Sequence, residues 1–263
     1  MSTENARGRF VWHDLLTTDP EAAKAFYTAV VGWGTTIWDQ MDPPYTMWTA
    51  GEKPIGGILQ KPAEALAAGA KPEWLAYVTV PDVDATIARA QELGGKVMAP
   101  PRDIPTVGRF TVLADPQGAF IAAFKPEGEQ PEADGMPPLG DFSWHELATT
   151  DYEAAFAFYS DLFGWEKTNA MDMGPAGVYQ MYGRNGQTLG GMYNKAAGTP
   201  GSPAWLHYAR VADVNVSAEK TKALGGQVIN GPMEVPGGDW IVMGIDPQGG
   251  PFAVHQVGAP ASR

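Results

Sequence analysis

The chain has 263 residues, of which 44% are hydrophobic and 18% are charged, a composition typical of globular proteins with a substantial core. Thirty acidic residues against eighteen basic ones give a formal net charge of −12, which disfavours nucleic acids and anionic membranes as partners. Because the chain contains no cysteine, disulfides, thiolate zinc sites and cysteine nucleophiles are excluded.

The hydropathy of the chain indicates no targeting or membrane segment. The first ten residues carry no apolar leader, and no stretch approaches the roughly 18 apolar residues that a membrane span requires. The absence of cysteine also fits a reducing compartment. We therefore expect a cytoplasmic protein with no membrane partner.

The first predicted elements are a strand over residues 10–16 and a helix that follows it. Asp19 and Pro20 are typical of a helix start, with aspartate as the N-cap and proline at the first helical position. Apolar residues then recur with the spacing of one helix face, at Ala23, Phe26, Tyr27 and Val30. This stripe is expected to pack on a sheet.

A second strand and helix follow after residue 73. The strand is predicted over 74–80 and the helix from about Asp82 to Leu93, with Gly94 placed where a left-handed C-cap is needed. Three short β-rich runs come next, and the Asp-Pro-Gln-Gly sequence at 115–118 is a turn between the last two. The sequence thus predicts two successive modules of the form βαβββ.

The second half of the chain repeats the first. Residues 10–33 align without gaps with residues 142–165, and the Asp-Pro-Gln-Gly turn recurs at 246–249. Such self-similarity indicates an internal duplication. It predicts four βαβββ modules, whose helices begin near four aspartates: Asp19, Asp82, Asp151 and Asp213.

Segments rich in proline and glycine divide these modules. The predicted first domain spans residues 1–126, the linker 127–140 and the second domain 141–263. The modules within them are predicted at 10–60, 74–126, 141–194 and 204–257. The fold class is α+β, and the sequence leaves open whether modules pair with their neighbours or in a crossed arrangement, first with fourth.

The order of these motifs resembles the vicinal oxygen chelate superfamily of glyoxalases, bleomycin-resistance proteins and extradiol dioxygenases. The resembling features are Phe-Tyr and Gly-Trp after each first strand, Leu-Gly-Gly after the next helix, and the Asp-Pro-Gln-Gly turn before the last strand. The resemblance covers nearly the whole chain, twice. It implies curved mixed sheets around a cavity with helices outside, but no single reaction, because the superfamily includes lyases, isomerases, dioxygenases and binding proteins.

Many enzymes of that superfamily hold a divalent metal ion with His, Gln or Glu side chains. The corresponding positions here carry Trp, Leu and Ala, namely Trp12, Leu75 and Ala122 in the first half and Trp144, Leu206 and Ala253 in the second. Three of the four histidines, His13, His145 and His207, are one residue away from such a position, and a one-residue offset on a strand reverses the face. We therefore expect these three on the helix-covered side and no metal cofactor; a divalent-metal-dependent lyase or dioxygenase is the alternative, if strand bulges change the register.

Strand alternation predicts what lines the cavity instead. It places Phe10, Trp12 and Asp14 on one face in the first half, and Phe142, Trp144 and Glu146 in the second. An aromatic shelf beside a carboxylate suits a mostly apolar ligand with a hydrogen-bond donor or cationic group. Asp14 and Glu146 are also candidate catalytic bases. The alternative is that the tryptophans fill the core and the carboxylates are satisfied by the protein.

Four further residues are candidate ligand contacts. Gly57 and Gly191 fall inside strands, where glycine indicates a bulge or the close approach of another group. Arg109 could pair with Asp14 or with an anionic ligand. His255 lies two residues beyond Ala253 and therefore on the same strand face.

The sequence thus predicts a small-molecule-binding protein, which binds, sequesters or converts a mostly apolar organic ligand. It leaves open whether the protein is an enzyme; if so, a glyoxalase-like lyase or isomerase, or a dioxygenase, is expected. The expected partner is a small organic ligand, and a homodimer is compatible with the sequence.

Overall fold

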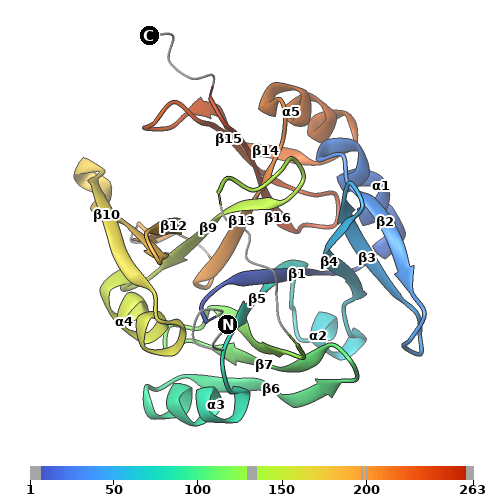
Figure 1. Ribbon diagram of the computed structural model, residues 1–263. Helices are drawn as coiled ribbons and strands as arrows, with labels where there is room; N and C mark the ends of the chain where they lie inside the picture. Colours follow the sequence, from blue (N-terminus) through green and yellow to red (C-terminus); the bar gives the residue numbers. More distant parts are fainter. Residues whose placement is uncertain (1–6, 129–134, 197, 200, 259–263) are drawn as a thin grey trace. The chain divides into compact units, whose positions relative to one another are not determined.

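The computed structural model describes residues 7–128, 135–196, 198–199 and 201–258 (Figure 1). Across these ranges, no helix combines the length and the apolar character needed to span a bilayer. The structure confirms four βαβββ modules in an α+β fold.

The first half contains two modules joined by a short helix that was not predicted, α2 (Ala63–Ala67). The elements of the first module are β1 (Phe10–Thr17), α1 (Pro20–Val30), β2 (Gly34–Trp38), β3 (Tyr45–Ala50) and β4 (Lys53–Gln60). Those of the second are β5 (Glu73–Thr79), α3 (Val83–Glu92), β6 (Lys96–Ile104), β7 (Gly108–Ala114) and β8 (Phe120–Pro126).

The second half repeats this order of elements. The third module contains β9 (Phe142–Thr149), α4 (Tyr152–Phe163), β10 (Glu166–Asp172), the short 3-10 helix η2 (Gly174–Ala176), β11 (Val178–Arg184) and β12 (Gln187–Asn194). The fourth contains β13 (Ala204–Arg210), α5 (Val214–Ala223), β14 (Gln227–Glu234), β15 (Trp240–Ile245) and β16 (Pro251–Gln256).

The four long helices begin where the sequence predicts. Asp19, Asp82 and Asp151 each accept a hydrogen bond of 2.9–3.0 Å from the backbone N–H three residues on, and Asp213 caps α5 in a similar way. Each cap satisfies a backbone donor that the helix leaves unpaired and typically contributes about 1 kcal/mol.

In the part of the chain that the structure describes, sixteen strands form two eight-stranded mixed sheets. The first has the order β2-β3-β4-β1-β5-β8-β7-β6, and the second has the equivalent order β10-β11-β12-β9-β13-β16-β15-β14. In each module the first strand runs parallel to the last one and the other pairs are antiparallel. Backbone hydrogen bonding therefore groups the first module with the second and the third with the fourth.

Packing groups the modules differently. Among the described residues, one compact unit comprises 7–12, 75–128, 145–196, 198–199 and 201–205, and the other comprises 13–74, 135–144 and 206–258. We call them the 2–3 unit and the 1–4 unit, after the modules that they contain. The compact units therefore follow the crossed pairing that the sequence left open, in which the first module packs with the fourth.

Each unit has its own hydrophobic core beneath a pair of helices. In the 1–4 unit the predicted stripe of α1 is buried, and α1 packs beside α5 (Figure 1). The hydroxyl of Ser217 on α5 donates a 2.8 Å hydrogen bond to the carbonyl of Val30 at the end of α1. In the 2–3 unit α3 lies beside α4, whose buried stripe repeats that of α1 with Ala155, Phe158, Tyr159 and Leu162.

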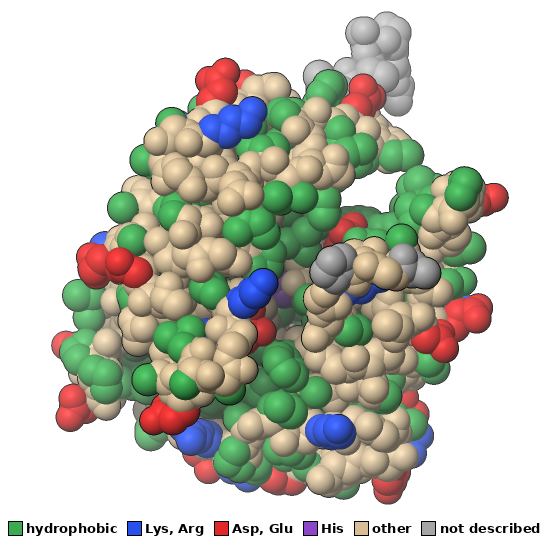
Figure 2. Space-filling view, turned by 180° about the vertical axis from the view of Figure 1, so that it is seen from behind, with side chains coloured by type: hydrophobic (Ala, Val, Ile, Leu, Met, Phe, Trp, Pro, Cys, Tyr) green, Lys and Arg blue, Asp and Glu red, His purple; other side chains and the backbone are tan. Residues whose placement is uncertain are grey.

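Charged side chains lie mainly at the surface. On the face shown in Figure 2, acidic side chains occur in small groups at several places with basic ones between them. The net charge of −12 is therefore not gathered into one acidic patch on that face.

Candidate functional site

The two faces of the strands are distinguished by what packs on them. In β16, Phe252 and Val254 belong to the core of the 1–4 unit beneath the helices. Because side chains alternate along a strand, Ala253 and His255 point to the opposite side, which we call the helix-free face. In β1, Leu15 is a core residue, so Asp14 lies on the helix-free face.

His13 and His207 lie on the core side, as expected from the one-residue offset. The ring of His13 stacks on Phe142 at 3.8 Å between centroids and meets His207 edge-on at 4.9 Å. Phe142 itself packs against Trp33 and Trp74 in the core of the 1–4 unit. Burial lowers the pKa of His207 to about 3, so this imidazole is neutral at physiological pH.

His145 has the equivalent position in the 2–3 unit. Its ring stacks on Phe10 with 3.6 Å between centroids, and Phe10 stacks in turn on Trp165 at 5.3 Å. Trp165 is a member of the core of that unit. His145 is therefore a packed aromatic residue of the core side.

On the helix-free face, Asp14 is held by a tyrosine. The hydroxyl of Tyr45 on β3 donates a hydrogen bond to the carboxylate of Asp14, which is only 4% exposed. The ring of Tyr45 passes over Gly57, where a Cβ atom would lie 1.7 Å from the tyrosine oxygen. Gly57 thus makes room for this tyrosine, which refines the prediction of a close approach at that glycine.

The third module contains the same arrangement. The hydroxyl of Tyr179 donates a 2.9 Å hydrogen bond to Glu146, and a Cβ atom on Gly191 would lie 2.0 Å from the Tyr179 ring. Tyr193 stacks on Tyr179 at 5.9 Å. Burial, with a smaller contribution from the charge of Glu146, raises the pKa of Tyr193 to about 12.

We call these two arrangements the carboxylate–tyrosine pairs, Asp14–Tyr45 in the 1–4 unit and Glu146–Tyr179 in the 2–3 unit. The tyrosine hydrogen bond fixes the direction of the carboxylate, whose oxygens are hydrogen-bond acceptors and can take up a proton. Each pair is therefore an oriented acceptor on the helix-free face.

The predicted aromatic shelf is only partly present. Phe10 and Phe142 pack in the cores described above, whereas Trp12 and Trp144 are half-buried and outside both core clusters. The boundary between the two units falls after Trp12 in β1 and after Trp144 in β9. Each phenylalanine therefore packs in the core of its own unit and not in the unit of the carboxylate on the same strand.

Arg109 and His255 have partners in their own units. The guanidinium of Arg109 pairs with Asp103 at 2.9 Å and Asp84 at 3.0 Å, which differs from the predicted pairing with Asp14. The ring of His255 is hydrogen-bonded on both sides, at 2.8 Å to Ser143 and at 3.0 Å to Asp239.

Comparison with known proteins identifies the family. The model of the Glyoxalase/Bleomycin resistance protein/Dioxygenase superfamily matches residues 9–122 and again residues 142–253. The chain belongs to this superfamily. The two matched regions correspond to the two halves of the duplication, so both halves are glyoxalase-like domains.

Two relatives match over nearly their whole length. CFP32 of Mycobacterium tuberculosis, which is named as a glyoxylase on a provisional basis, is 33% identical over 258 residues, 96% of each chain. The anthracycline biosynthesis protein DnrV of Streptomyces peucetius is 30% identical over 275 residues, covering 99% of this chain and 98% of the relative. Among solved structures, the Mn(II)-bound glyoxalase of Novosphingobium aromaticivorans shares the fold, with a TM-score of 0.60 and 17% identity over 95% of this chain and 82% of that one.

The positions that sequence reasoning assigned to the superfamily's metal carry side chains without suitable ligand atoms. In the 2–3 unit they are Trp12, Leu75 and Ala122, and the last two are buried hydrocarbon side chains. Neither offers a donor atom, and an indole N–H is a hydrogen-bond donor only. Divalent cations are held by carboxylate, imidazole, thiolate or carbonyl groups.

Sequence reasoning missed the tyrosines of the carboxylate–tyrosine pairs. Tyr45 and Tyr179 occur at matching places in the duplication, each two residues before a methionine whose backbone faces Gly57 or Gly191 on the neighbouring strand. Residues two apart share a strand face, so this register would have indicated the contact. Sequence reasoning also missed the contacts of His255 with Ser143 and Asp239. The three residues lie on separate segments of the chain, and no local pattern connects them.

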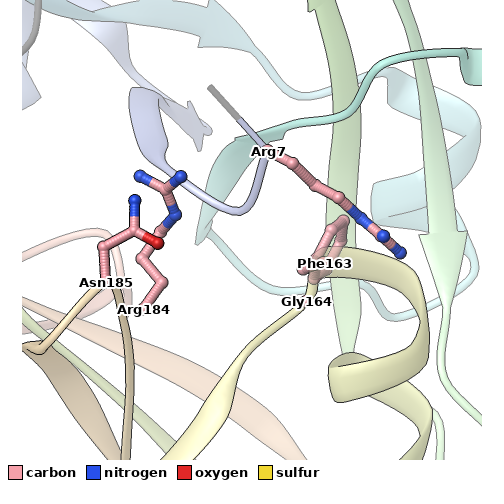
Figure 3. Close-up of a pocket in the computed structure, with 5 residues that line it drawn as sticks. All are labelled: Arg7, Phe163, Gly164, Arg184 and Asn185. Carbon is pink, nitrogen blue, oxygen red and sulfur yellow. The ribbon is translucent and has the colours of Figure 1, made fainter. Parts of the chain in front are cut away.

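A small surface hollow of about 230 Å³ lies in the 2–3 unit. It is lined by Arg7, Phe163, Gly164, Arg184 and Asn185 (Figure 3). Arg7 extends toward Gly164 and donates to the carbonyl of Leu162 at 3.1 Å, at the end of α4. Its guanidinium therefore caps the helix C-terminus, and we do not assign a ligand to this hollow.

Proposed function

We propose that this protein binds a small, mostly apolar organic molecule that carries a hydroxyl or cationic group, on the helix-free faces of its sheets. The observation that carries the proposal is the duplicated carboxylate–tyrosine pair. Asp14 and Glu146 differ in length, yet each is oriented by a tyrosine that passes over a glycine. A carboxylate held in this way recognises a hydrogen-bond donor in an otherwise apolar ligand.

The proposed binding uses no metal ion. The indoles of Trp12 and Trp144, which are half-buried, are the proposed contacts for the apolar part of the ligand. If the ligand is converted, Asp14 or Glu146 is the proposed general base.

The relative DnrV suggests a first ligand to test. Its name links it to anthracycline biosynthesis, and anthracyclines are planar polycyclic aromatics with several hydroxyl groups. Such a molecule has the two properties that the site requires, a flat apolar body and polar donors. We therefore propose an anthracycline as the test ligand.

The test is a titration followed by quenching of tryptophan fluorescence and by calorimetry. The variants Asp14→Asn and Glu146→Gln keep the side-chain shape and should each weaken binding at their own site by about 1–3 kcal/mol. Asp39→Asn removes an exposed carboxylate and is the control, with affinity unchanged. Trp12→Leu and Trp144→Leu should remove the fluorescence quenching at their own sites. The proposal is rejected if the three carboxylate variants bind with the affinity of the unmodified protein and the two tryptophan variants show unchanged quenching.

One observation favours a second function, that of a divalent-metal-dependent lyase or dioxygenase. His13 and His207 are neighbouring buried imidazoles of the 1–4 unit, 4.9 Å apart between ring centroids. A neutral imidazole is a common metal ligand, and the lowered pKa of His207 keeps this ring neutral. The metal measurements in the Discussion separate the two functions.

A further inference from the structure

Three polar side chains of the 1–4 unit form a chain that takes no part in the carboxylate–tyrosine pairs. Ser143 Oγ lies 2.8 Å from Nδ1 of His255, and Nε2 of the same ring lies 3.0 Å from Oδ2 of Asp239. The side chain of His255 is 9% exposed and that of Asp239 is 33% exposed. Ser143, on β9, is half-buried.

The hydrogen bonds determine which ring nitrogen carries the proton. A carboxylate only accepts, so the contact with Asp239 places the proton of a neutral His255 on Nε2. Nδ1 of this tautomer has a lone pair that faces Ser143 Oγ at 2.8 Å, and the single proton of the hydroxyl can be donated to it or to the carbonyl of Tyr208 at 3.3 Å. The other carboxylate oxygen of Asp239 accepts a 2.8 Å bond from the backbone N–H of Gly258, which fixes its orientation.

The duplication shows that the fold does not require these groups. In the first half the positions of Ser143, Asp239 and His255 are occupied by Val11, Gly108 and Phe124. The ring of Phe124 lies over Gly108, where a Cβ atom would be 2.7 Å from it, much as the ring of His255 meets Asp239. The first half therefore carries no polar group at these three positions, and the polar trio belongs to the second half alone.

We propose that Ser143 is a nucleophile that accepts acyl groups from activated esters, with His255 as the general base and Asp239 as the residue that positions its ring. Serine, imidazole and carboxylate in hydrogen-bonded series are the arrangement by which hydrolases activate a hydroxyl. Here the ring nitrogens have exchanged roles relative to serine proteases, because Nδ1 faces the serine.

The reaction balances without a cofactor. Ser143 Oγ forms a bond to the ester carbonyl carbon while its proton passes to Nδ1 of His255. The bond from that carbon to the leaving oxygen breaks, and the leaving alcohol takes the proton from His255. Water then attacks the acyl-serine by the same route, which releases a carboxylic acid and restores the hydroxyl. The net change is ester plus water to acid plus alcohol.

The test uses the full chain and p-nitrophenyl acetate. Release of p-nitrophenolate follows acetylation, and peptide mass mapping locates the acetyl group, which we expect on Ser143. Ser143→Val should abolish this adduct, and His255→Phe should slow its formation by about 100-fold or more. Both substitutions introduce the residue that the first half carries, so folding is expected to persist; circular dichroism checks this. Ser202→Ala, at an exposed serine, should leave the rate unchanged.

The role of Asp239 is tested with Asp239→Asn. Loss of the carboxylate should slow acetylation by about 10-fold or more, and Asp239→Glu, which keeps a carboxylate beside the ring, should restore part of the rate. An acetyl group found on other residues only, or rates in His255→Phe and Asp239→Asn equal to that of the unmodified protein, would overturn the proposal. Since Asp14 and Glu146 take no part, its failure would leave the ligand-binding proposal unaffected.

Discussion

The hydroxyl of Tyr27 on α1 donates a 2.9 Å hydrogen bond to the carboxylate of Asp246, in the turn that precedes the last strand of the fourth module. Trp74 donates its indole N–H to the same hydroxyl at 3.3 Å. The 2–3 unit repeats the arrangement with Tyr159, Asp115 and Trp205 at 2.9 and 3.2 Å. The Tyr27–Asp246 bond thus ties the first module to the fourth inside one core.

Tyr27→Phe should lower the free energy of unfolding by about 1–3 kcal/mol, because it leaves a buried carboxylate oxygen of Asp246 and the indole of Trp74 without their hydroxyl partner. Denaturant unfolding measures the change. Tyr152→Phe, on a half-exposed tyrosine of α4, is the control and should stay within about 0.5 kcal/mol. Equal effects of the two substitutions would contradict the importance of the buried bond.

His207 should make the protein less stable in acid. Its pKa falls from the ordinary 6.5 to about 3 in the folded protein, because burial penalises the charged ring. Between these pH values the unfolded chain binds a proton that the folded chain does not, so stability is lost as the pH falls below 6.5. His207→Gln should reduce the slope of unfolding free energy against pH by about 1.4 kcal/mol per unit between pH 6 and 4. Parallel curves for the two proteins would show that the ring is protonated without cost.

Gly57→Ala should disturb the first carboxylate–tyrosine pair. The new methyl group would overlap the ring of Tyr45 and displace its hydroxyl from Asp14, at a cost of about 1–3 kcal/mol. The double variant with Tyr45→Ala tests the cause, because without the ring Gly57→Ala should cost little. A double-mutant cycle from chemical unfolding measures this coupling. Additive effects would mean that Gly57 is required for another reason.

Elemental analysis after mild purification should find well below one equivalent of Fe, Mn, Ni or Zn per chain, in line with the proposed metal-free function. Added metal should leave the melting temperature almost unchanged, whereas a site filled at 100 times its dissociation constant would add about 2.7 kcal/mol. His207→Ala is the matched variant. A large metal-dependent rise in melting temperature that disappears in this variant would favour the metal-dependent alternative.

Local patterns in the sequence determined the elements and the family. The four aspartate N-caps, the apolar stripe of α1 and the duplicated turns act within a few residues, so their consequences are readable without the fold. Alternation along the strand likewise placed His13 and His207 on the core side. Within a strand ladder the side-chain period of two leaves little freedom.

Contacts between distant segments were decided by the tertiary structure. The pairing of the first core with the fourth depends on bonds such as Tyr27–Asp246, whose partners no local pattern connects. Phe10 and Phe142 lie in strands that are divided between the two units, so alternation along the strand did not show in which core each would pack. The tyrosines that hold Asp14 and Glu146, and the trio of Ser143, Asp239 and His255, likewise come together only when separate strands align side by side. Register along one strand is a local property, whereas the partner that a side chain meets depends on which strands become neighbours.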